Sequence, residues 1–375
     1  MQFIDLHTQY TALKKDINEN IQHVLENAQY IGGVQVKELE HKLAEYVGRA
    51  HCITCGNGTD ALQLAYMMLG VGKGDAIFCP DMTFIASVEP ALMLGATPVF
   101  CDIKADTYTI CPDSLERQIK AVLDEGRLTP KVVVAVDILG NPCEYEALEF
   151  ICQKYHLTLV EDAAQGFGAS YHGRRAGSFG KISTTSFFPA KPLGCYGDGG
   201  AIFVDDEDLA QLCRSLCVHG KGPKGKYDNV RVGMNSRLDT IQAAVLLVKL
   251  KAFEEYELEL RQNIARRYTE AFRTLFQIPY VASDCISAWA QYALLAKNQQ
   301  QRDAIVEHLT DQGIPNMIYY PTPQHQLPVF ATLNIYEEKF KNARDYCART
   351  FSLPMHPYLQ ADQQEKIVSC VKEKM

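Results

Sequence analysis

The alternation of short apolar runs with helical patterns over the first 205 residues limits the possible folds more than any other feature of this chain. Five runs have the length and apolar composition of buried strands: residues 76–80, 97–103, 131–138, 157–162 and 200–206. Helical segments lie between them, such as residues 60–69, for which Thr59 is the expected N-cap and Gly70 the expected stop. The pattern predicts an α/β fold with a mostly parallel sheet covered by helices.

The pattern changes after residue 237, where apolar residues recur at the spacing of one buried helix face: Leu238, Ile241, Val245, Val248 and Ala252. A chain of 375 residues exceeds the usual size of a single domain. We therefore expect this helix to join a large domain, residues 1–250, to a smaller C-terminal α/β domain, residues 251–375.

Composition and charge argue against several classes of protein. Hydrophobic residues make up 47% and charged residues 22% of the chain, as in ordinary globular proteins. No apolar run approaches the roughly 18 residues that a membrane-spanning helix needs. The N-terminus lacks the pattern of a secretory signal, so we expect a cytoplasmic location. A net charge of −8 argues against a general affinity for nucleic acid or anionic membranes.

The thirteen cysteines are scattered through apolar segments, and we expect buried, reduced thiols, for example at Cys79, Cys101, Cys152 and Cys285. Cys52 and Cys55 form a CxxC pair, but no second pair of cysteines or histidines stands at zinc-binding spacing. The sequence therefore predicts no metal site.

A basic segment, HGKGPKGKY from His219 to Tyr227, interleaves lysines with glycines and a proline, which indicates a mobile loop. Two interpretations stay open. The loop is either a solvated surface segment or a lid in which Lys221–Lys226 contact an anionic ligand such as a nucleotide diphosphate.

The segment SFFPAKPLGCYGDGGAIF, residues 186–203, places Lys191 in a turn-rich passage just before a strand. A lysine in such a position becomes a nucleophile when burial lowers its pKa and frees the amine to form an imine. Ser186 could bind a phosphate through its hydroxyl. On these residues alone, an ordinary surface lysine is an equal alternative.

Two further elements support a cofactor site. Asp162 ends an apolar strand, and a buried carboxylate at the carboxyl edge of a sheet needs a cationic partner, such as a protonated pyridine nitrogen. Its alternative is a cap for the next helix. The turn Gly56–Thr59 precedes a helix, whose free N–H groups and positive dipole end suit a phosphate, although the turn could equally be a structural cap.

With these three elements in this order, the chain resembles the fold-type I pyridoxal-phosphate enzymes and, within them, the DegT/DnrJ/StrS family of sugar aminotransferases. The resemblance runs nearly end to end, through FIDL, QYIGG, NGTDAL, VEDAAQ, SFFPAKPLGCYGDGGA, VGMNSRLDTIQAA and YYPTPQH. It implies a seven-stranded type of sheet, pyridoxal 5'-phosphate as the cofactor, and a homodimer with shared active sites.

The resemblance also implies roles for individual residues. Lys191 would form the Schiff base with the cofactor and carry the proton between substrate and cofactor, and Asp162 would keep the pyridine nitrogen protonated. The other cofactor contacts would be Phe84 stacked on the ring, Gln165 at its 3-oxygen, Gly58, Thr59 and Ser186 at the phosphate, and Asn235 at the phosphate of the neighbouring subunit.

Within the family, the strings FFPAKPLGCYGDGGAIF and RVGMNSRLDTIQAA are most similar to enzymes that move an amino group from glutamate to UDP-2-acetamido-2-deoxy-3-oxo-glucuronate, in the synthesis of bacterial cell-surface polysaccharides. A uronate needs a cation for its carboxylate, and Arg237 suits planar bidentate recognition. The alternative is an arginine that only braces the dimer. His219 would lie near the sugar nucleotide.

The chain departs from the family where a His-Tyr-Pro sequence is common, because it carries Tyr319, Tyr320 and Pro321 there. Tyr319 and Tyr320 are candidate substrate contacts, and a phenol donates a hydrogen bond but differs from imidazole in reach and charge. His325 fits a later histidine of the family pattern and is a candidate substrate contact. Its alternative is a partly exposed loop histidine.

Three other functions compete with this hypothesis. The acceptor could be a UDP- or dTDP-linked 4-keto-6-deoxy sugar instead of a 3-keto uronate. A sugar dehydratase is disfavoured because those relatives replace the lysine with histidine, whereas Lys191 is intact. A non-catalytic sensor on the same scaffold is disfavoured because Asp162, Gln165, Ser186 and Lys191 are all present.

Overall fold

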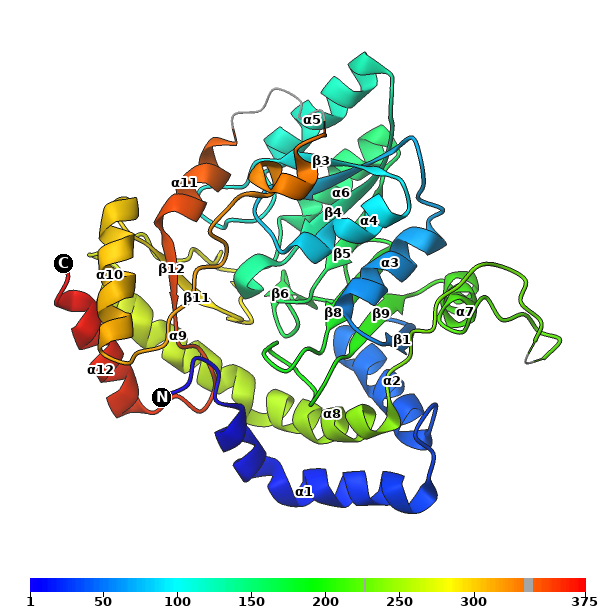
Figure 1. Cartoon of the computed structure of the whole chain (residues 1–375), viewed down its shortest axis with the longest axis horizontal. Coiled ribbons are helices and arrows are strands. Elements are labelled where there is room, and N and C mark those ends of the chain that lie inside the picture. The colour runs from blue at the N-terminus through cyan, green and yellow to red at the C-terminus, as the bar shows by residue number, and fades with distance from the viewer. Residues whose placement is uncertain (226, 334–339) are drawn as a thin grey trace.

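The computed structural model describes residues 1–225, 227–333 and 340–375. Its centre is a seven-stranded sheet (Figure 1) in which only β9 runs antiparallel to its neighbours, β1 and β8. The mostly parallel α/β sheet is therefore confirmed. In spatial order the strands are β1 (His51–Cys55), β9 (Gly200–Val204), β8 (Ile182–Ser186), β5 (Thr158–Asp162), β4 (Thr129–Val136), β2 (Asp75–Pro80) and β3 (Thr97–Cys101).

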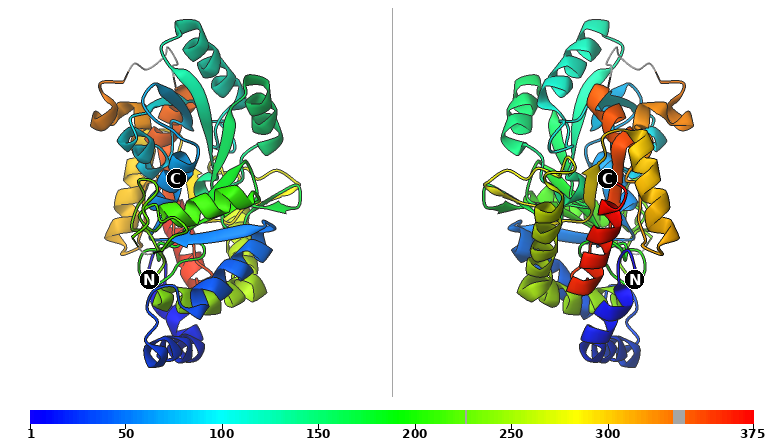
Figure 2. Two further views of the ribbon diagram at one scale, coloured as in Figure 1. Left: turned by 90° about the vertical axis from the view of Figure 1, so that its right-hand side faces the viewer. Right: turned by 90° about the vertical axis from the view of Figure 1, so that its left-hand side faces the viewer.

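Helices cover both faces of this sheet (Figures 1 and 2). Alternate strand residues point to opposite sides, and apolar side chains on both sides must be covered. Val132 and Val134 of β4 pack in the core that contains α3 (Gly58–Met68), whereas Val133 and Ala135 pack against α5 (Pro112–Glu125) and α6 (Tyr145–Tyr155). The remaining helices around the sheet are α2 (Val34–Val47), α4 (Glu89–Met93) and α7 (Glu207–Leu216), with short turns η1 (Ile85–Ser87) and η2 (Ile138–Gly140).

A helical spine leads from the sheet to the C-terminal part of the chain. It consists of α8 (Thr240–Ala252), the π-helical turn η3 (Phe253–Glu257) and α9 (Leu258–Phe272), and α1 (Leu6–Asn27) packs along α8. Of the predicted buried face, Leu238, Val245 and Ala252 are buried, but Ile241 and Val248 are only half-buried. Val248 instead lines a groove between α1, α2 and α8.

The C-terminal part has a core of its own, made of residues between Ile264 and Val371. Its elements are β11 (Tyr292–Leu295), α10 (Gln299–Asp311), η4 (Gln324–Gln326), η5 (Pro328–Phe330), α11 (Lys341–Arg349), β12 (Thr350–Leu353) and α12 (Ala361–Lys372). The N-terminus also reaches this part, since Met355 N donates to Phe3 O at 3.4 Å. The division at residue 250 stays a prediction.

The three remaining strands, β6 (Ser170–Tyr171), β7 (Arg174–Arg175) and β10 (Cys285–Ile286), form a small separate sheet.

Several local predictions were wrong. Asn57, not Thr59, caps α3, because its side-chain oxygen accepts from Asp60 N at 2.8 Å and the helix already begins at Gly58. Cys285 is only half-buried, as is Cys111, whereas the other cysteines are buried.

Among the described residues, no helix combines the length and the apolar character that crossing a bilayer requires.

Strands β1 and β8 were not predicted. The sequence of β8, ISTTS, is polar, yet the strand is fully buried. Its hydroxyls compensate by donating to backbone carbonyls: Ser183 to Phe179 O at 2.7 Å, Thr184 to Glu161 O at 3.0 Å and Thr185 to Ala163 O at 3.1 Å.

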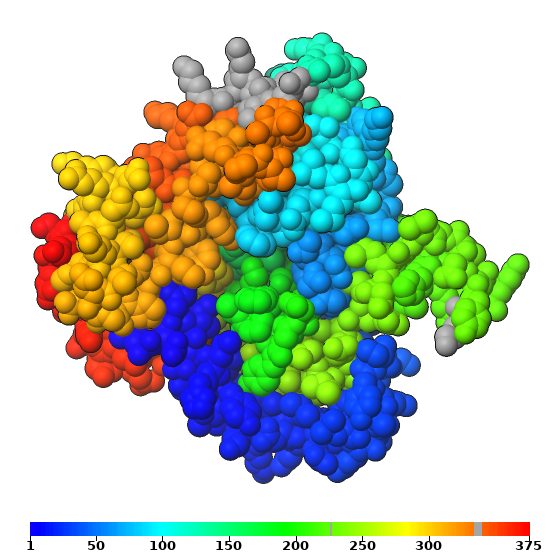
Figure 3. Space-filling model, viewed as in Figure 1, coloured from blue at the N-terminus to red at the C-terminus, as the bar shows by residue number. Residues whose placement is uncertain are grey.

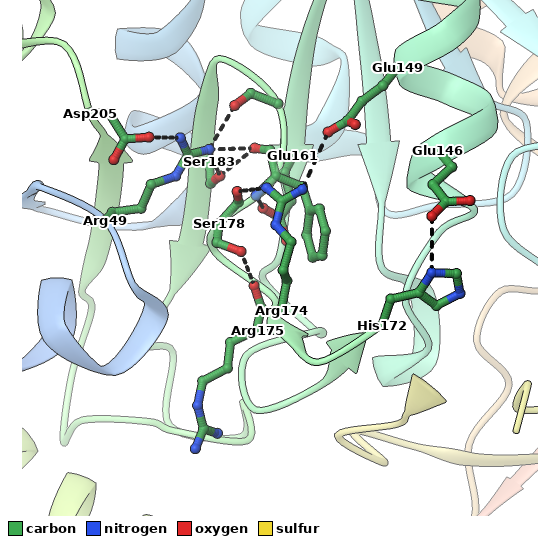
Figure 4. Close-up of polar contacts among 12 residues, drawn as sticks. Arg49, Glu146, Glu149, Glu161, His172, Arg174, Arg175, Ser178, Ser183 and Asp205 are labelled. Atoms are coloured by element: carbon green, nitrogen blue, oxygen red, sulfur yellow. Dashed lines mark hydrogen bonds and ion pairs between the residues drawn. The ribbon is translucent and has the colours of Figure 1, made fainter. Parts of the chain in front are cut away.

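A buried carboxylate fixes the loop that leads into β8 (Figure 4). Glu161 of β5 is fully buried and accepts from Gly177 N at 2.7 Å and from Phe179 N at 2.8 Å. Arg49 reaches the same loop and donates to Gly180 O at 2.7 Å. Because Glu161 and Asp162 are successive strand residues, one side of β5 holds this loop and the other faces the candidate site described below.

We expect Glu161→Ala to lower the free energy of unfolding by about 3 kcal/mol, because it leaves two buried N–H groups without an acceptor. Urea denaturation followed by circular dichroism measures this change. Glu149→Ala, which removes an exposed carboxylate 3.9 Å from Arg174, is the matched control and should change the free energy by less than about 0.5 kcal/mol. Equal stability of the two variants would contradict the role given to Glu161.

Candidate active site

The predicted cofactor residues meet at the carboxyl edge of the sheet. Asp162 is the last residue of β5 and Ser186 the last residue of β8, and these strands are parallel neighbours. Gly58 follows β1 at the same edge and begins α3, which packs on β8. The order of the strands thus brings together residues that are far apart in the sequence.

Asp162 is buried and held by two hydrogen bonds. Its Oδ2 accepts from Ser87 Oγ at 2.8 Å and its Oδ1 from Ala164 N at 3.1 Å. Burial raises the pKa of Asp162, while Ser87, Ala164 N–H and the charge of Lys191 oppose that rise. The carboxylate therefore lies where a cationic partner would stabilise its charged form.

Lys191 lies in the loop between β8 and β9, close enough to Asp162 for their charges to interact. Burial lowers the pKa of its amine, and the Asp162 charge opposes this shift. Lys191 N donates to Phe188 O at 2.8 Å, which forms a turn. Farther along the loop, Tyr196 N donates to Gln242 Oε1 at 2.8 Å, and this bond fixes the loop on α8. Lys191 as a whole is half-buried, and the structure thus provides an amine whose pKa is lowered, on an anchored loop.

The turn before α3 makes close contact with β8. A Cβ atom on Gly58 would come within 2.6 Å of Ser186 Cβ, so only glycine fits at this position. The backbone N–H groups of Gly58 and Thr59, in the first turn of α3, have no acceptor within the helix, and Ser186 Oγ lies beside them. Free N–H groups, a helix N-terminus and a hydroxyl together suit a phosphate group.

Ser236 links this turn to the segment that carries Asn235. Gly56 N donates to Ser236 Oγ at 2.9 Å, and Ser236 Oγ donates to Asp60 Oδ2 at 2.6 Å. Asn235 and Arg237, on either side of Ser236, are exposed and hydrogen-bonded to each other. Their side chains are therefore available at the surface of the molecule.

Gln165 and Phe84 both contact Tyr320 of the C-terminal part. Gln165 Nε2 donates to Tyr320 Oη at 3.0 Å, and its Oε1 accepts from Leu139 N at 2.7 Å. The Phe84 ring is half exposed and its centroid lies 6.1 Å from that of Tyr320. Burial raises the pKa of Tyr320, so its phenol stays protonated and can donate a hydrogen bond.

The turn with Tyr319 and His325 comes from the C-terminal part of the chain. Burial also raises the pKa of Tyr319, which is half-buried. Both ring nitrogens of His325 already have protein partners: Nδ1 lies 2.6 Å from Asp81 Oδ2, and Arg344 donates to Nε2 at 3.2 Å. His325 is thus more enclosed than a loop histidine, and a substrate contact would have to displace Arg344.

The basic segment after α7 projects from the body of the molecule together with residues up to 235 (Figures 1 and 3). We call residues 219–235 the arm. His219 is exposed, and its N donates to Met234 O at 2.8 Å, which ties the two ends of the arm together. Lys226, which belongs to the predicted lysine cluster, lies outside the described residues.

Sequence reasoning missed Ser87, Thr83 and Tyr66, which hold Asp162 in place. Thr83 Oγ1 lies 2.9 Å from Ser87 Oγ, and Tyr66 Oη donates to Ser87 O at 2.5 Å. A serine and a threonine on a loop carry no distinctive pattern, so only the fold shows their proximity to the carboxylate.

The fold and these side chains define a class of protein: an α/β enzyme that places a desolvated lysine beside a buried carboxylate and a phosphate-binding type of turn. The family model of the DegT/DnrJ/EryC1/StrS aminotransferases matches residues 11–372, and the chain belongs to this family. It is therefore an aminotransferase, as predicted.

Relatives match along the whole chain. A UDP-2-acetamido-2-deoxy-3-oxo-D-glucuronate aminotransferase of Pseudomonas aeruginosa is 43% identical over 364 residues, which is 96% of each protein. A DegT DnrJ EryC1 StrS aminotransferase of Brucella abortus has a similar structure, with a TM-score of 0.96, 44% identity and coverage of 100% of this chain and 99% of that one. DesV of S. venezuelae, solved in complex with a ketimine intermediate, has a TM-score of 0.92 at 33% identity, with coverage of 99% and 97%.

Ser87→Ala should move the acid limb of the pH profile of kcat/KM to higher pH by about one unit. The Ser87 hydroxyl stabilises the charged form of Asp162, so its loss should raise the pKa of this carboxylate, and we expect the acid limb to follow that pKa. Transaminase assays across pH measure the shift. Ser352→Ala, which removes another buried hydroxyl, is the control. An unchanged acid limb in Ser87→Ala would contradict the coupling to Asp162.

Proposed function

We propose that this aminotransferase uses pyridoxal 5'-phosphate to move an amino group from glutamate to a nucleotide-linked keto-sugar, with UDP-2-acetamido-2-deoxy-3-oxo-glucuronate as the acceptor, for cell-surface polysaccharide synthesis. The observation that carries this proposal is the juxtaposition of Lys191 and Asp162 at the sheet edge. The Pseudomonas aeruginosa relative, at 43% identity over nearly the whole chain, supports the choice of acceptor.

The residues present fit the proposed cofactor. Asp162 is buried and accepts hydrogen bonds from two neutral donors, Ser87 Oγ and Ala164 N, so it suits a protonated pyridine nitrogen. The close approach of Gly58 to Ser186 leaves a cradle of N–H and hydroxyl groups for the phosphate. The half-exposed Phe84 ring offers a flat apolar surface for stacking.

When bound, pyridoxal phosphate supplies an aldehyde that takes up amino groups and a ring that stabilises negative charge on the adjacent carbon. Asp162 would keep that ring in its electron-accepting, protonated form. Lys191, whose pKa is lowered by burial, would carry the proton between the substrate carbon and C4′ of the cofactor through its Nζ. Gln165, held by Leu139 N and Tyr320, would orient the ring through its 3-oxygen.

The surface of the chain supports a homodimer with shared sites. Val232 and Val230, two residues apart on the arm, are 86% and 52% exposed, and a second copy could cover these apolar side chains. Asn235 and Arg237 are exposed at the base of this arm. We infer that the arm packs on a second copy, where Asn235 would reach the phosphate and Arg237 and His219 the sugar nucleotide.

The competing functions are less well supported. A sugar dehydratase would not need Lys191, which stands here with a lowered pKa beside Asp162. A sensor would not need the support that Ser87, Thr83 and Tyr66 give to Asp162. A 4-keto-6-deoxy acceptor, UDP- or dTDP-linked, would use the same lysine and differs only in what recognises the sugar.

Lys191→Ala should reduce amine transfer by at least about 10³-fold, because it removes both the nucleophile and the proton carrier. Amine transfer from glutamate is followed by mass spectrometry of the sugar product. In the unaltered enzyme, borohydride reduction followed by peptide mapping should find the cofactor mass on Lys191. Lys249→Ala removes another buried lysine whose pKa burial lowers to about 8, and serves as the control. Cofactor mass on a different lysine would refute the assignment.

Arg237→Gln should lower kcat/KM for the 3-keto uronate by about 10- to 200-fold, because an unpaired substrate carboxylate loses its cation. The same variant should act nearly normally on the 3-keto sugar that lacks the carboxylate. Arg231→Gln, which removes another exposed arginine six residues earlier, is the matched control. If Arg237→Gln lowers kcat/KM equally for both acceptors and elutes as a monomer, Arg237 only braces the dimer. If the unaltered enzyme prefers dTDP-4-keto-6-deoxy sugars, the proposed uronate acceptor is refuted.

A further inference from the structure

Three side chains of the kinds that bind transition metals converge on the side of the C-terminal part away from the central sheet. His308 lies in the last turn of α10, Cys370 in the last turn of α12, and Glu373 directly follows α12. Their ligand atoms all lie within 4.8 Å of one another. His308 Nε2 and Glu373 Oε2 are 3.0 Å apart. The chain terminus lies beside α10 (Figure 1).

The three residues differ in how firmly they are held. The His308 side chain is 16% exposed and Cys370 is 5% exposed, whereas the Glu373 side chain is 63% exposed. Packing thus fixes the nitrogen and the sulfur, while the carboxylate can move. Tetrahedral zinc with bonds of about 2.0–2.3 Å needs ligand atoms about 3.3–3.8 Å apart, so a small movement of Glu373 would close the set.

The surroundings favour a cation. Both helices present their C-terminal turns here, and the free carbonyl groups of a helix C-terminus carry partial negative charge. Glu373 adds a full negative charge next to the thiol. Lys366, one turn earlier on α12, opposes this negative charge.

We propose that His308, Cys370 and Glu373 form a binding site for a zinc-class divalent cation, with water as the fourth ligand, which ties α12 to α10. On binding, the Cys370 thiol gives up its proton to solvent and its sulfur bonds to the metal, while His308 binds through neutral Nε2. No electron is transferred. The site is independent of the proposed sugar chemistry, since none of its residues belongs to the candidate active site.

Cadmium is the probe, because its bond to a thiolate produces an ultraviolet charge-transfer absorption. Titration of the cofactor-loaded enzyme with Cd²⁺ should give this absorption at one ion per chain, and Zn²⁺ should displace it. Cys370→Ser should abolish it. His308→Gln and Glu373→Gln should each weaken Cd²⁺ binding by about tenfold or more. Cys285→Ser, which removes a half-buried thiol elsewhere in the chain, should leave the titration unchanged.

Circular dichroism and transaminase activity without metal should match the unaltered enzyme in every variant, which shows that the variants fold. If Cys370→Ser does not fold, Glu373→Gln at the exposed position decides the question alone. Absence of the thiolate absorption in the unaltered enzyme would overturn the proposal. So would absorption that persists in Cys370→Ser, or affinity that Glu373→Gln leaves unchanged, since His308 and Glu373 would then be an ordinary ion pair.

Discussion

The requirement to keep a charged carboxylate buried beside a desolvated amine governs the architecture of this enzyme. Neither Asp162 nor Lys191 gains from burial by itself, because loss of water disfavours the charged form of each. Their positions are imposed by neighbours: Ser87, Thr83 and Tyr66 on one side, and Glu161 with its loop on the other face of β5. These hydrogen bonds near the sheet edge thus hold Asp162 and Lys191 in positions that burial alone would disfavour.

The turn that carries Tyr320 and His325 couples the C-terminal part to that pair. Tyr320 bonds to Gln165, His325 bonds to Asp81, and Gln324 N donates to Asp81 O at 2.7 Å. The segment that follows β2 and leads to Ser87 is therefore held by residues from the other end of the chain. A displacement of the C-terminal part would be transmitted directly to the support of Asp162.

The sequence predicted elements that have a periodic or apolar pattern, and it did not predict features that depend on contacts between distant segments. Apolar runs predicted five of the seven central strands, and the positions of Asp162 and Lys191 followed from strand ends and turn residues. Strand β8 was missed because its buried side chains are hydroxyls whose bonds are invisible in sequence. The supports of Asp162 and the cluster around His308 depend on contacts between distant segments, which no local pattern encodes.

The antiparallel placement of β9 has a consequence for how such a site can change over time. Ser186 of β8 and Gly200 of β9 are directly paired, and a Cβ atom on Gly200 would come within 2.4 Å of Asn57 O. The two ends of the loop that carries Lys191 are thus held together by this residue pair of the sheet. Insertions or deletions in it would shift the amine along an arc away from Asp162. Changes in this loop that keep the amine beside Asp162 are therefore expected to be substitutions and not changes in its length.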